Sequence, residues 1–285
     1  MIYADLHMHT NYSDGLYEPE KVFMNAKEKG LGCIAICDHD TFFQQEIISY
    51  LSHKFHIKSI PGIEMSCYNY KAMKKVHIVG LFLNKEAPHV TELCNRTLLA
   101  RDNYHKKLIK KFNEIGYNIT YEDAKKFSPH NIVFKMNIFS ALKEKYPEID
   151  DDFYKKYFQS KVPYTDELQM GYIDVKSGID AINKDGGVAI LAHPNLYDSF
   201  PEIDEYVGYG LGGIEIDHHS MSDEDRKSAI RIADKYGLLK SGGSDYHKTR
   251  FTKSGIEHLG NFGLTKEQFD MFITKCINGG IINDF

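Results

Sequence analysis

Short apolar runs alternate with amphipathic stretches along most of the chain, and this alternation restricts the fold more than any other feature of the sequence. Apolar runs separated by stretches of helical period are typical of βα units around a parallel sheet. The predicted strands are Ile2–Leu6, Gly32–Cys37, Lys58–Gly62, Val76–Phe82, Gly187–Leu191, Gly213–Ile216 and Leu238–Ser241. We therefore expect an α/β fold.

Helices are predicted between several of these strands, and some have recognisable ends. The helix Glu18–Lys29 is followed by Gly30, which suits a C-cap. Ser222 and Asp225 form a capping-box pattern at the start of the helix Asp223–Tyr236. Further helices are predicted at Asp174–Lys184 and from a Thr265 cap to Ile277.

The middle of the chain differs from this pattern. Between about Pro88 and Pro163 there is no convincing strand, but helical patterns cover His89–Ile115, Lys135–Lys145 and Asp151–Phe158. We interpret residues 88–163 as an inserted helical subdomain that covers the substrate. Residues 1–87 and 164–285 would then form the main domain.

Charge and cysteine content exclude several classes of protein. The net charge of −5 gives no general attraction to nucleic acid or to a membrane surface. The five cysteines show no CxxC spacing, which argues against a disulfide framework and favours the cytoplasm. The sequence shows neither a secretion signal nor a transmembrane run, and no obligate protein partner is evident.

Histidine and acidic residues recur at or near the ends of the predicted strands. His7 and His9 stand two apart at the end of the first strand, so both rings lie on one face. Asp14 follows in a Ser-Asp-Gly turn, and the later strands deliver His39, Asp40, Glu64, His77, His193, Asp245 and His247. Each has a simpler explanation alone, such as a buried core histidine or a turn cap. Because parallel strand ends share one rim, together they favour a metal site.

At these residues the chain resembles the polymerase and histidinol phosphatase (PHP) family. The motifs that carry the resemblance are D-L-H-M-H-T-x-x-S-D-G, C-D-H-D-T, P-G-I-E, V-H-I-V-G, L-A-H-P and G-G-S-D-Y-H. The resemblance covers nearly the whole chain and is weaker in the inserted helices. It implies a distorted (β/α)7 barrel, similar to a TIM barrel, with a di- or trinuclear metal site and phosphoesterase activity.

The resemblance also implies how the ligands are shared. His7, His9, Glu64 and Asp245 would hold one ion; Asp14, His39 and His247 a second; and Glu64, bridging, with His77 and His193 a third. This nitrogen and oxygen donor set lacks thiolate, which suits two or three Mn, Fe or Zn ions. The ions would lower the pKa of a bridging water and supply a hydroxide nucleophile. Glu64 and Asp245 are therefore expected to be essential for catalysis.

The Ser-Asp-Gly version of the first motif looks like the branch of small nucleotide phosphoesterases. The resemblance implies a nucleoside 3′,5′-bisphosphate or a short oligoribonucleotide as the substrate. Where that branch has Gly-Arg-Pro-His-Ile-Ala, this chain has Phe134-Lys-Met-Asn-Ile-Phe, so Lys135 and Asn137 replace an Arg and a His. We predict that Lys135, Asn137 and Lys161 contact the substrate, with the two lysines holding a second phosphate.

The role of Asp40 and the choice between alternative functions stay open at this stage. Asp40, beside His39, is a candidate proton donor to the leaving group, or else an outer partner that orients a ligand. A phosphatase of histidinol phosphate or another small metabolite is a rival enzyme. A non-catalytic metal-binding module that regulates a partner is the alternative outside enzymes.

Overall fold

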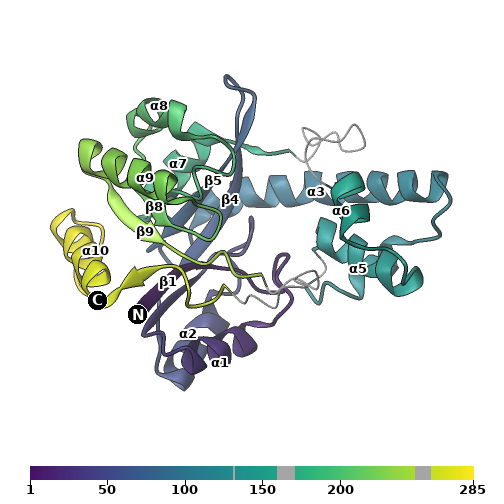
Figure 1. Ribbon diagram of the computed structural model, residues 1–285, viewed down its shortest axis with the longest axis horizontal. Helices are drawn as coiled ribbons and strands as arrows, with labels where there is room; N and C mark the ends of the chain where they lie inside the picture. The colour runs from purple at the N-terminus through teal and green to yellow at the C-terminus, as the bar shows by residue number, and fades with distance from the viewer. Residues whose placement is uncertain (131, 159–170, 248–257) are drawn as a thin grey trace.

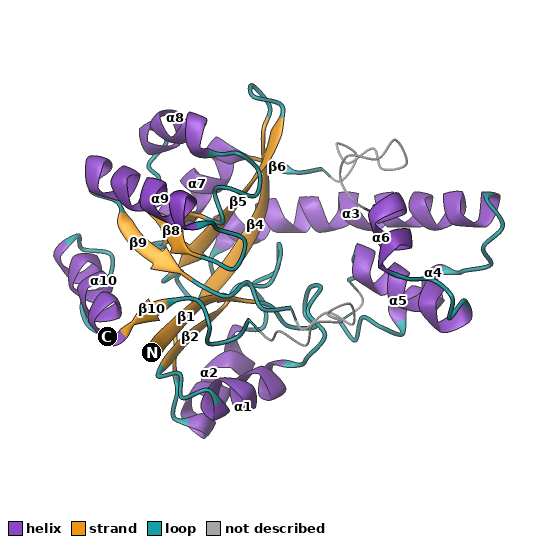
Figure 2. Cartoon of the chain, in the orientation of Figure 1, coloured by secondary structure: helices purple, strands orange, loops and turns teal. Residues whose placement is uncertain are grey.

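The computed structural model describes residues 1–130, 132–158, 171–247 and 258–285. The described strands form two sheets (Figures 1 and 2). In order, the first sheet contains β10 (Leu264–Thr265), β1 (Ile2–Met8), β2 (Cys33–Ile36) and β3 (Lys58–Ser59). The second contains β6 (Ile173–Asp174), β4 (Gly62–Asn69), β5 (Lys74–Leu81), β7 (Val188–Leu191), β8 (Gly213–Asp217) and β9 (Leu239–Gly242). The α/β class expected from the sequence is confirmed.

Isolated backbone bridges join the two sheets at two places. Met8 in β1 pairs in parallel with Tyr246, which follows β9, and His39 pairs in parallel with Glu64 in β4. The backbone N–H of His9 also donates to the carbonyl of Tyr246 at 2.9 Å. Among the described residues the strands do not form one closed sheet. The sheets meet where the predicted site residues lie.

Strand direction differs from the expected parallel arrangement. β5 is antiparallel to both β4 and β7. The predicted strand Lys58–Gly62 corresponds to β3 and only the first residue of β4, because β4 continues to Asn69. Glu64 and Ser66 interrupt the apolar run in β4, yet both are buried. Most of β4 was therefore not predicted, because its buried polar residues break the apolar run on which the strand prediction depends.

Most of the predicted helices around the sheets are confirmed to within a residue. The structure has α1 (Pro19–Glu28), α7 (Val175–Lys184), α9 (Asp223–Tyr236) and α10 (Lys266–Asn278). The Ser222–Asp225 capping box is present at α9, and Thr265 caps α10 in the same way. The sequence analysis missed α2 (Gln45–Phe55), α8 (Ile203–Gly208) and the short 3-10 helix Phe200–Glu202. None of the described helices combines the length and apolar character needed to cross a bilayer.

The described part of the middle of the chain contains helices and loops but no strand, as predicted. It contains α3 (Pro88–Glu114), α4 (Tyr121–Lys125), α5 (Lys135–Lys145) and α6 (Asp151–Phe158). Apolar side chains from these helices, including Phe112, Phe139 and Leu142, form a cluster of their own. In Figure 1 the group stands to one side of the sheets, and the start of α3 reaches back to α7.

Candidate metal centre

Glu64 lies at the middle of the cluster of predicted ligands. Its side chain is fully buried, and its Oε2 is 3.2 Å from the Nε2 atoms of both His7 and His9. The Nδ1 of His39 is 3.1 Å from the same oxygen. One carboxylate oxygen therefore faces three imidazoles that come from β1 and from the loop after β2.

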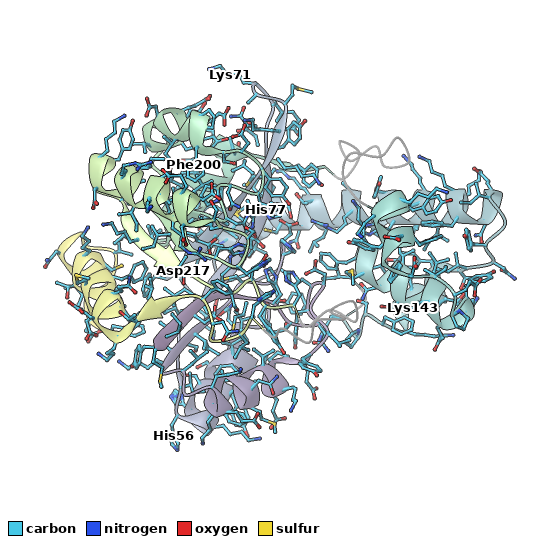
Figure 3. The ribbon with its side chains drawn as sticks, in the orientation of Figure 1. His56, Lys71, His77, Lys143, Phe200 and Asp217 are labelled. Carbon is cyan, nitrogen blue, oxygen red and sulfur yellow. The ribbon has the colours of Figure 1, made fainter. Side chains whose placement is uncertain are left out.

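The other oxygen of Glu64 faces two more histidines. Its Oε1 lies 2.8 Å from His77 Nδ1 and 2.8 Å from His193 Nε2. His77 comes from the middle of β5, and Figure 3 shows it near the centre of the molecule. Because β5 is antiparallel, His77 reaches the site from within a strand rather than from a shared rim of strand ends.

The remaining predicted ligands lie on the outer side of His9. Asp245 Oδ1 is 3.1 Å from His9 Nε2, and Asp14 Oδ1 is 3.1 Å from His247 Nε2. His39 Nε2 is 3.9 Å from the other oxygen of Asp14. All nine residues predicted as ligands are thus brought into one connected cluster, although their positions in the sequence extend from 7 to 247.

The donor set fits divalent cations. Several ligand atoms are buried and have no hydrogen-bond partner. They are His7 Nε2, His9 Nε2, Asp14 Oδ1, His39 Nδ1, Glu64 Oε2 and Asp245 Oδ1. Buried polar atoms are normally hydrogen-bonded, so a convergent group of unpaired ones calls for a ligand. The residues Glu64, Asp245, His7 and His9 have ligand atoms that all lie within 4.8 Å of one another.

Burial and mutual charge perturb the pKa values of this cluster strongly. Burial would raise the pKa of Glu64, but His39, His7 and His77 outweigh it and hold the pKa well below its usual value. Burial would lower the pKa of His7, but the charges of Glu64 and Glu215 raise it well above normal. Protons balance the carboxylates in the metal-free protein, and bound cations would take their place.

Backbone strain coincides with the cluster. Among the predicted site residues, Asp40, His193 and Asp245 have positive φ angles of 53°, 25° and 52°. Left-handed backbone costs non-glycine residues about 1–3 kcal/mol each and persists where the surroundings enforce it. A Cβ added to Gly243 would lie 2.4 Å from the Cβ of His7, so only glycine lets these segments approach.

Glu215 and His218 belong to the site but were not predicted. Glu215 is buried, accepts from the backbone N–H of His193 at 2.6 Å and lies 2.8 Å from His7 Nδ1. It therefore orients two ligand histidines, as partners behind metal ligands do. Its place in the apolar strand β8, just before an unusual His-His pair, was the available signal.

His218, in the loop directly after β8, faces Asp245, which follows β9. With His219 and Asp245 it forms a further group of candidate ligand atoms. However, the backbone N–H of Ser220 donates to His218 Nδ1 at 3.1 Å, so the neutral ring carries its proton on Nε2. That nitrogen is 3.4 Å from Asp245 Oδ2. His218 thus presents a proton, not a lone pair, to the carboxylate.

The prediction that Asp40 donates a proton is not supported by its contacts. Asp40 is fully buried and forms an ion pair with Arg101 of α3. It also accepts from the backbone N–H of Ser66 at 2.8 Å, and Arg101 Nη2 donates to Ser66 Oγ at 3.1 Å. Both carboxylate oxygens of Asp40 are therefore engaged by donors of the fold itself. Asp40 instead anchors α3 beside His39.

The predicted substrate contacts are only partly placed. Asn137 uses its amide inside the fold, accepting from Phe134 N at 2.7 Å and donating to Phe127 O at 2.8 Å. Asn137 also lines a cavity beside Asp14, and its contact with the substrate stays a prediction. Lys135 Nζ donates to the carbonyl of Phe158 at 3.2 Å. Lys161 lies outside the described residues.

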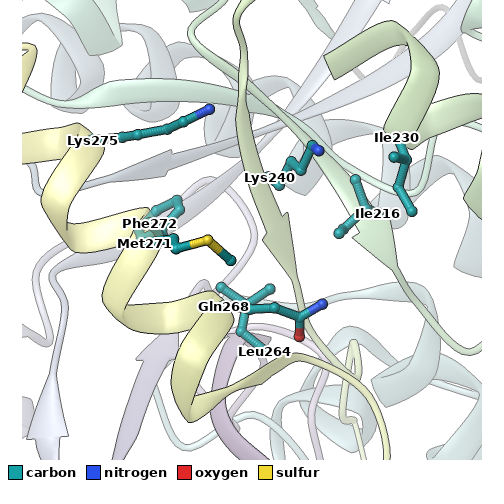
Figure 4. A pocket seen from close by; sticks show the side chains of 8 residues that line it. All are labelled: Ile216, Ile230, Lys240, Leu264, Gln268, Met271, Phe272 and Lys275. Atoms are coloured by element: carbon teal, nitrogen blue, oxygen red, sulfur yellow. The ribbon is translucent and has the colours of Figure 1, made fainter. Parts of the chain in front are cut away.

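Two cavities adjoin the cluster. One of about 270 Å³ lies between the loop after β1 and the helices α4 and α5, and Asp14, Asn11 and Met136 line it. The other, of about 340 Å³, has Asp40 and Phe43 in its lining. An apolar cavity of about 210 Å³ between α9, β9 and α10 contains none of the predicted ligands (Figure 4).

An imidazole and carboxylate cluster of this kind is the donor set with which metal-dependent hydrolases hold their ions. The PHP domain family matches residues 5–219, and the chain belongs to this family. It is a metal-dependent phosphoesterase. A solved structure from Bifidobacterium adolescentis, assigned as a metal-dependent phosphoesterase, superposes with a TM-score of 0.85 at 23% identity, covering 95% of this chain and 96% of that one. That likeness supports the fold.

Three characterised relatives are similar over most of their length. Phosphoribosyl 1,2-cyclic phosphate 1,2-diphosphodiesterase of Eggerthella lenta is 32% identical, covering 85% of this chain and 93% of the relative. The 5′-3′ exoribonuclease of Haemophilus influenzae is 26% identical, covering 85% and 89%. The 3′,5′-nucleoside bisphosphate phosphatase of Chromobacterium violaceum is 24% identical, covering 87% and 88%. All three names describe cleavage of phosphate esters.

Proposed function

We propose that the enzyme hydrolyses a phosphate ester of a nucleotide, either a nucleoside 3′,5′-bisphosphate or the 5′ end of a short oligoribonucleotide. The observation that carries this proposal is the group of buried, unpartnered donor atoms around Glu64. The names of the exoribonuclease and bisphosphate phosphatase relatives support a nucleotide as the substrate.

We propose that the nine clustered residues hold two or three Mn, Fe or Zn ions. His7, His9, Glu64 and Asp245 would hold the first. Asp14, His39 and His247 would hold the second, and Glu64, His77 and His193 the third. When bound, such ions supply positive charge for the phosphoryl oxygens and lower the pKa of a coordinated water. Glu215 would hold the ring of His7 and the backbone of His193 in the orientation that ion binding requires.

The substrate would enter beside the inserted helices. The cavity of about 270 Å³ opens at Asp14 and reaches α4 and α5, which suits a substrate with a second phosphate away from the reacting one. Burial lowers the pKa of His105 in α3, and the charges of Arg101 and Lys135 lower it further. Of these two cations, Arg101 is already paired with Asp40. Lys135, and Lys161 outside the described residues, remain our candidates for holding the second phosphate.

We also propose that the two sheets act as one distorted (β/α)7 barrel. The bridges Met8–Tyr246 and His39–Glu64 support this, because they connect β1 with the end of β9 and β2 with β4. In this arrangement residues 1–87 and 164–285 form the barrel, and residues 88–163 form the cap. The five cysteines are free and buried, which supports the cytoplasm as the compartment.

A second candidate substrate is a cyclic phosphate of a phosphorylated ribose. The identity of 32% with the E. lenta cyclic phosphate diphosphodiesterase favours it. The two candidates share a ribose that carries more than one phosphate ester linkage, and they differ in whether a base is attached. A second phosphate and a base are therefore the two features that an assay should vary.

The proposal is tested by comparing substrates on Mn-reconstituted protein. We expect fastest turnover of adenosine 3′,5′-bisphosphate or a 5′-phosphorylated oligoribonucleotide. Phosphoribosyl 1,2-cyclic phosphate and histidinol phosphate serve as the rival substrates. A higher kcat/KM for either rival would replace the proposed substrate class. Bound metal with turnover at background on all four would indicate a regulatory metal-binding module.

A further inference from the structure

Three aromatic rings from separate segments meet beside the metal centre. Tyr12 follows β1, Phe43 follows β2, and His130 lies between α4 and α5 of the insertion. The rings of Tyr12 and His130 are stacked, with centroids 3.5 Å apart and planes 19° apart. Phe43 lies 5.2 Å from Tyr12 and 6.2 Å from His130, centroid to centroid. We call these three residues the aromatic rim.

Residues of the aromatic rim, or their chain neighbours, line the two cavities near the site. Phe43 lines one cavity together with Asp40. The other cavity is lined by Asn11, the residue before Tyr12, and by Pro129, the residue before His130. Phe43 is thus the member of the rim that directly lines a cavity.

Phe43 is the exposed member of the rim. Its side chain is 61% exposed, whereas Phe42 beside it is buried. The stacked rings of Tyr12 and His130 lie beside it in tilted and edge-on arrangements and so support one side of the exposed ring. A neutral, flat and supported ring at the mouth of a polar site is suited to stacking on another π surface.

We propose that Phe43, supported by Tyr12 and His130, stacks on the base of the nucleotide whose phosphate lies at the metal centre. This inference rests on the proposed nucleotide substrate and adds the part of the protein that recognises the base. Stacking on an aromatic ring tolerates every base because each has a π face. The rim would therefore favour nucleotides over base-free ribose phosphates without selecting one base.

The test measures the preference for a base. Wild type and Phe43→Ala holoenzymes are assayed on adenosine 3′,5′-bisphosphate and on its abasic analogue, in which a tetrahydrofuran ring replaces the nucleoside. We expect Phe43→Ala to lower the ratio of the two kcat/KM values about tenfold, mainly through KM for the adenosine compound. Phe43→Tyr, which keeps a ring, should restore most of the ratio.

A matched control is available nearby. Tyr50 on α2 is 60% exposed, close to the 61% of Phe43, but does not belong to the rim. Tyr50→Ala should keep the wild-type ratio. If Phe43→Ala changes neither substrate, or both equally, the stacking inference is wrong while the nucleotide substrate stands. If wild type turns over neither these bisphosphates nor a 5′-phosphorylated oligoribonucleotide, the proposed function fails and the stacking inference fails with it.

Discussion

The ion pair between Asp40 and Arg101 gives a prediction that separates anchoring from acid catalysis. Both side chains are buried, at 0% and 7% exposure. Breaking a buried pair leaves one uncompensated charge and costs about 3–5 kcal/mol. We expect Arg101→Met to lower the free energy of unfolding by about that amount. Asp40→Asn should cost somewhat less, because its amide oxygen can still accept from the backbone N–H of Ser66.

The double variant makes the reasoning testable. If the two charges stabilise each other, Asp40→Asn with Arg101→Met should cost about 2–3 kcal/mol less than the sum of the single losses. Urea denaturation followed by far-UV circular dichroism, with a chelator present, measures this without a contribution from metal binding. Additive losses would refute the coupling. An Asp40→Asn variant of wild-type stability whose turnover falls more than about a hundredfold would restore Asp40 as the proton donor.

Three further outcomes follow from the site and its surroundings. Glu64→Ala and Asp245→Ala should fold but lose bound metal and turnover; more than about a tenth of the wild-type rate would contradict the assigned ligands. Chelation should abolish activity and lower the melting temperature, and added Mn should restore both; an active metal-free protein would contradict this. The pKa of buried His105 is lowered from 6.5 to about 3, mainly by burial. The folded state thus holds fewer protons, and stability should fall as the pH drops below 6.5, by about 2 kcal/mol at pH 5. Equal pH dependence in wild type and His105→Asn would refute this.

The chemistry of the site could be recognised from the sequence because its donors follow strand segments. His7 lies near the end of β1 and His9 follows directly after it, so the period of two predicts that both rings share a face. The other predicted ligands also lie in strands or shortly after them. The direction in which a strand runs cannot be read from its sequence pattern, because apolar residues alternate in the same way in parallel and antiparallel strands. The antiparallel course of β5, which carries His77, was therefore out of reach.

Side-chain partners far apart in the chain were also out of reach. Arg101 and Asp40 are 61 positions apart, and no local sequence pattern predicts that they form an ion pair. At the start of α5, the side chain of Asn137 accepts from the backbone N–H of Phe134. The usual sequence signal for such a cap has Ser or Thr at the position of Phe134. The aromatic rim likewise depends on how the insertion folds against the loop after β1. Local sequence patterns thus predicted the metal ligands, but they could not predict which distant side chains pair with one another.

The separate apolar cluster of α3 to α6 bears on how enzymes of this kind diversify. Residues such as Phe112 and Phe139 stabilise the inserted helices among themselves. In the proposed arrangement, in which the insertion covers the substrate, substitutions that keep this cluster and the Arg101–Asp40 pair would leave the packing beneath the histidines undisturbed. A lineage could then exchange one phosphorylated compound for another by substitutions in the insertion, while the hydrolytic machinery is inherited intact.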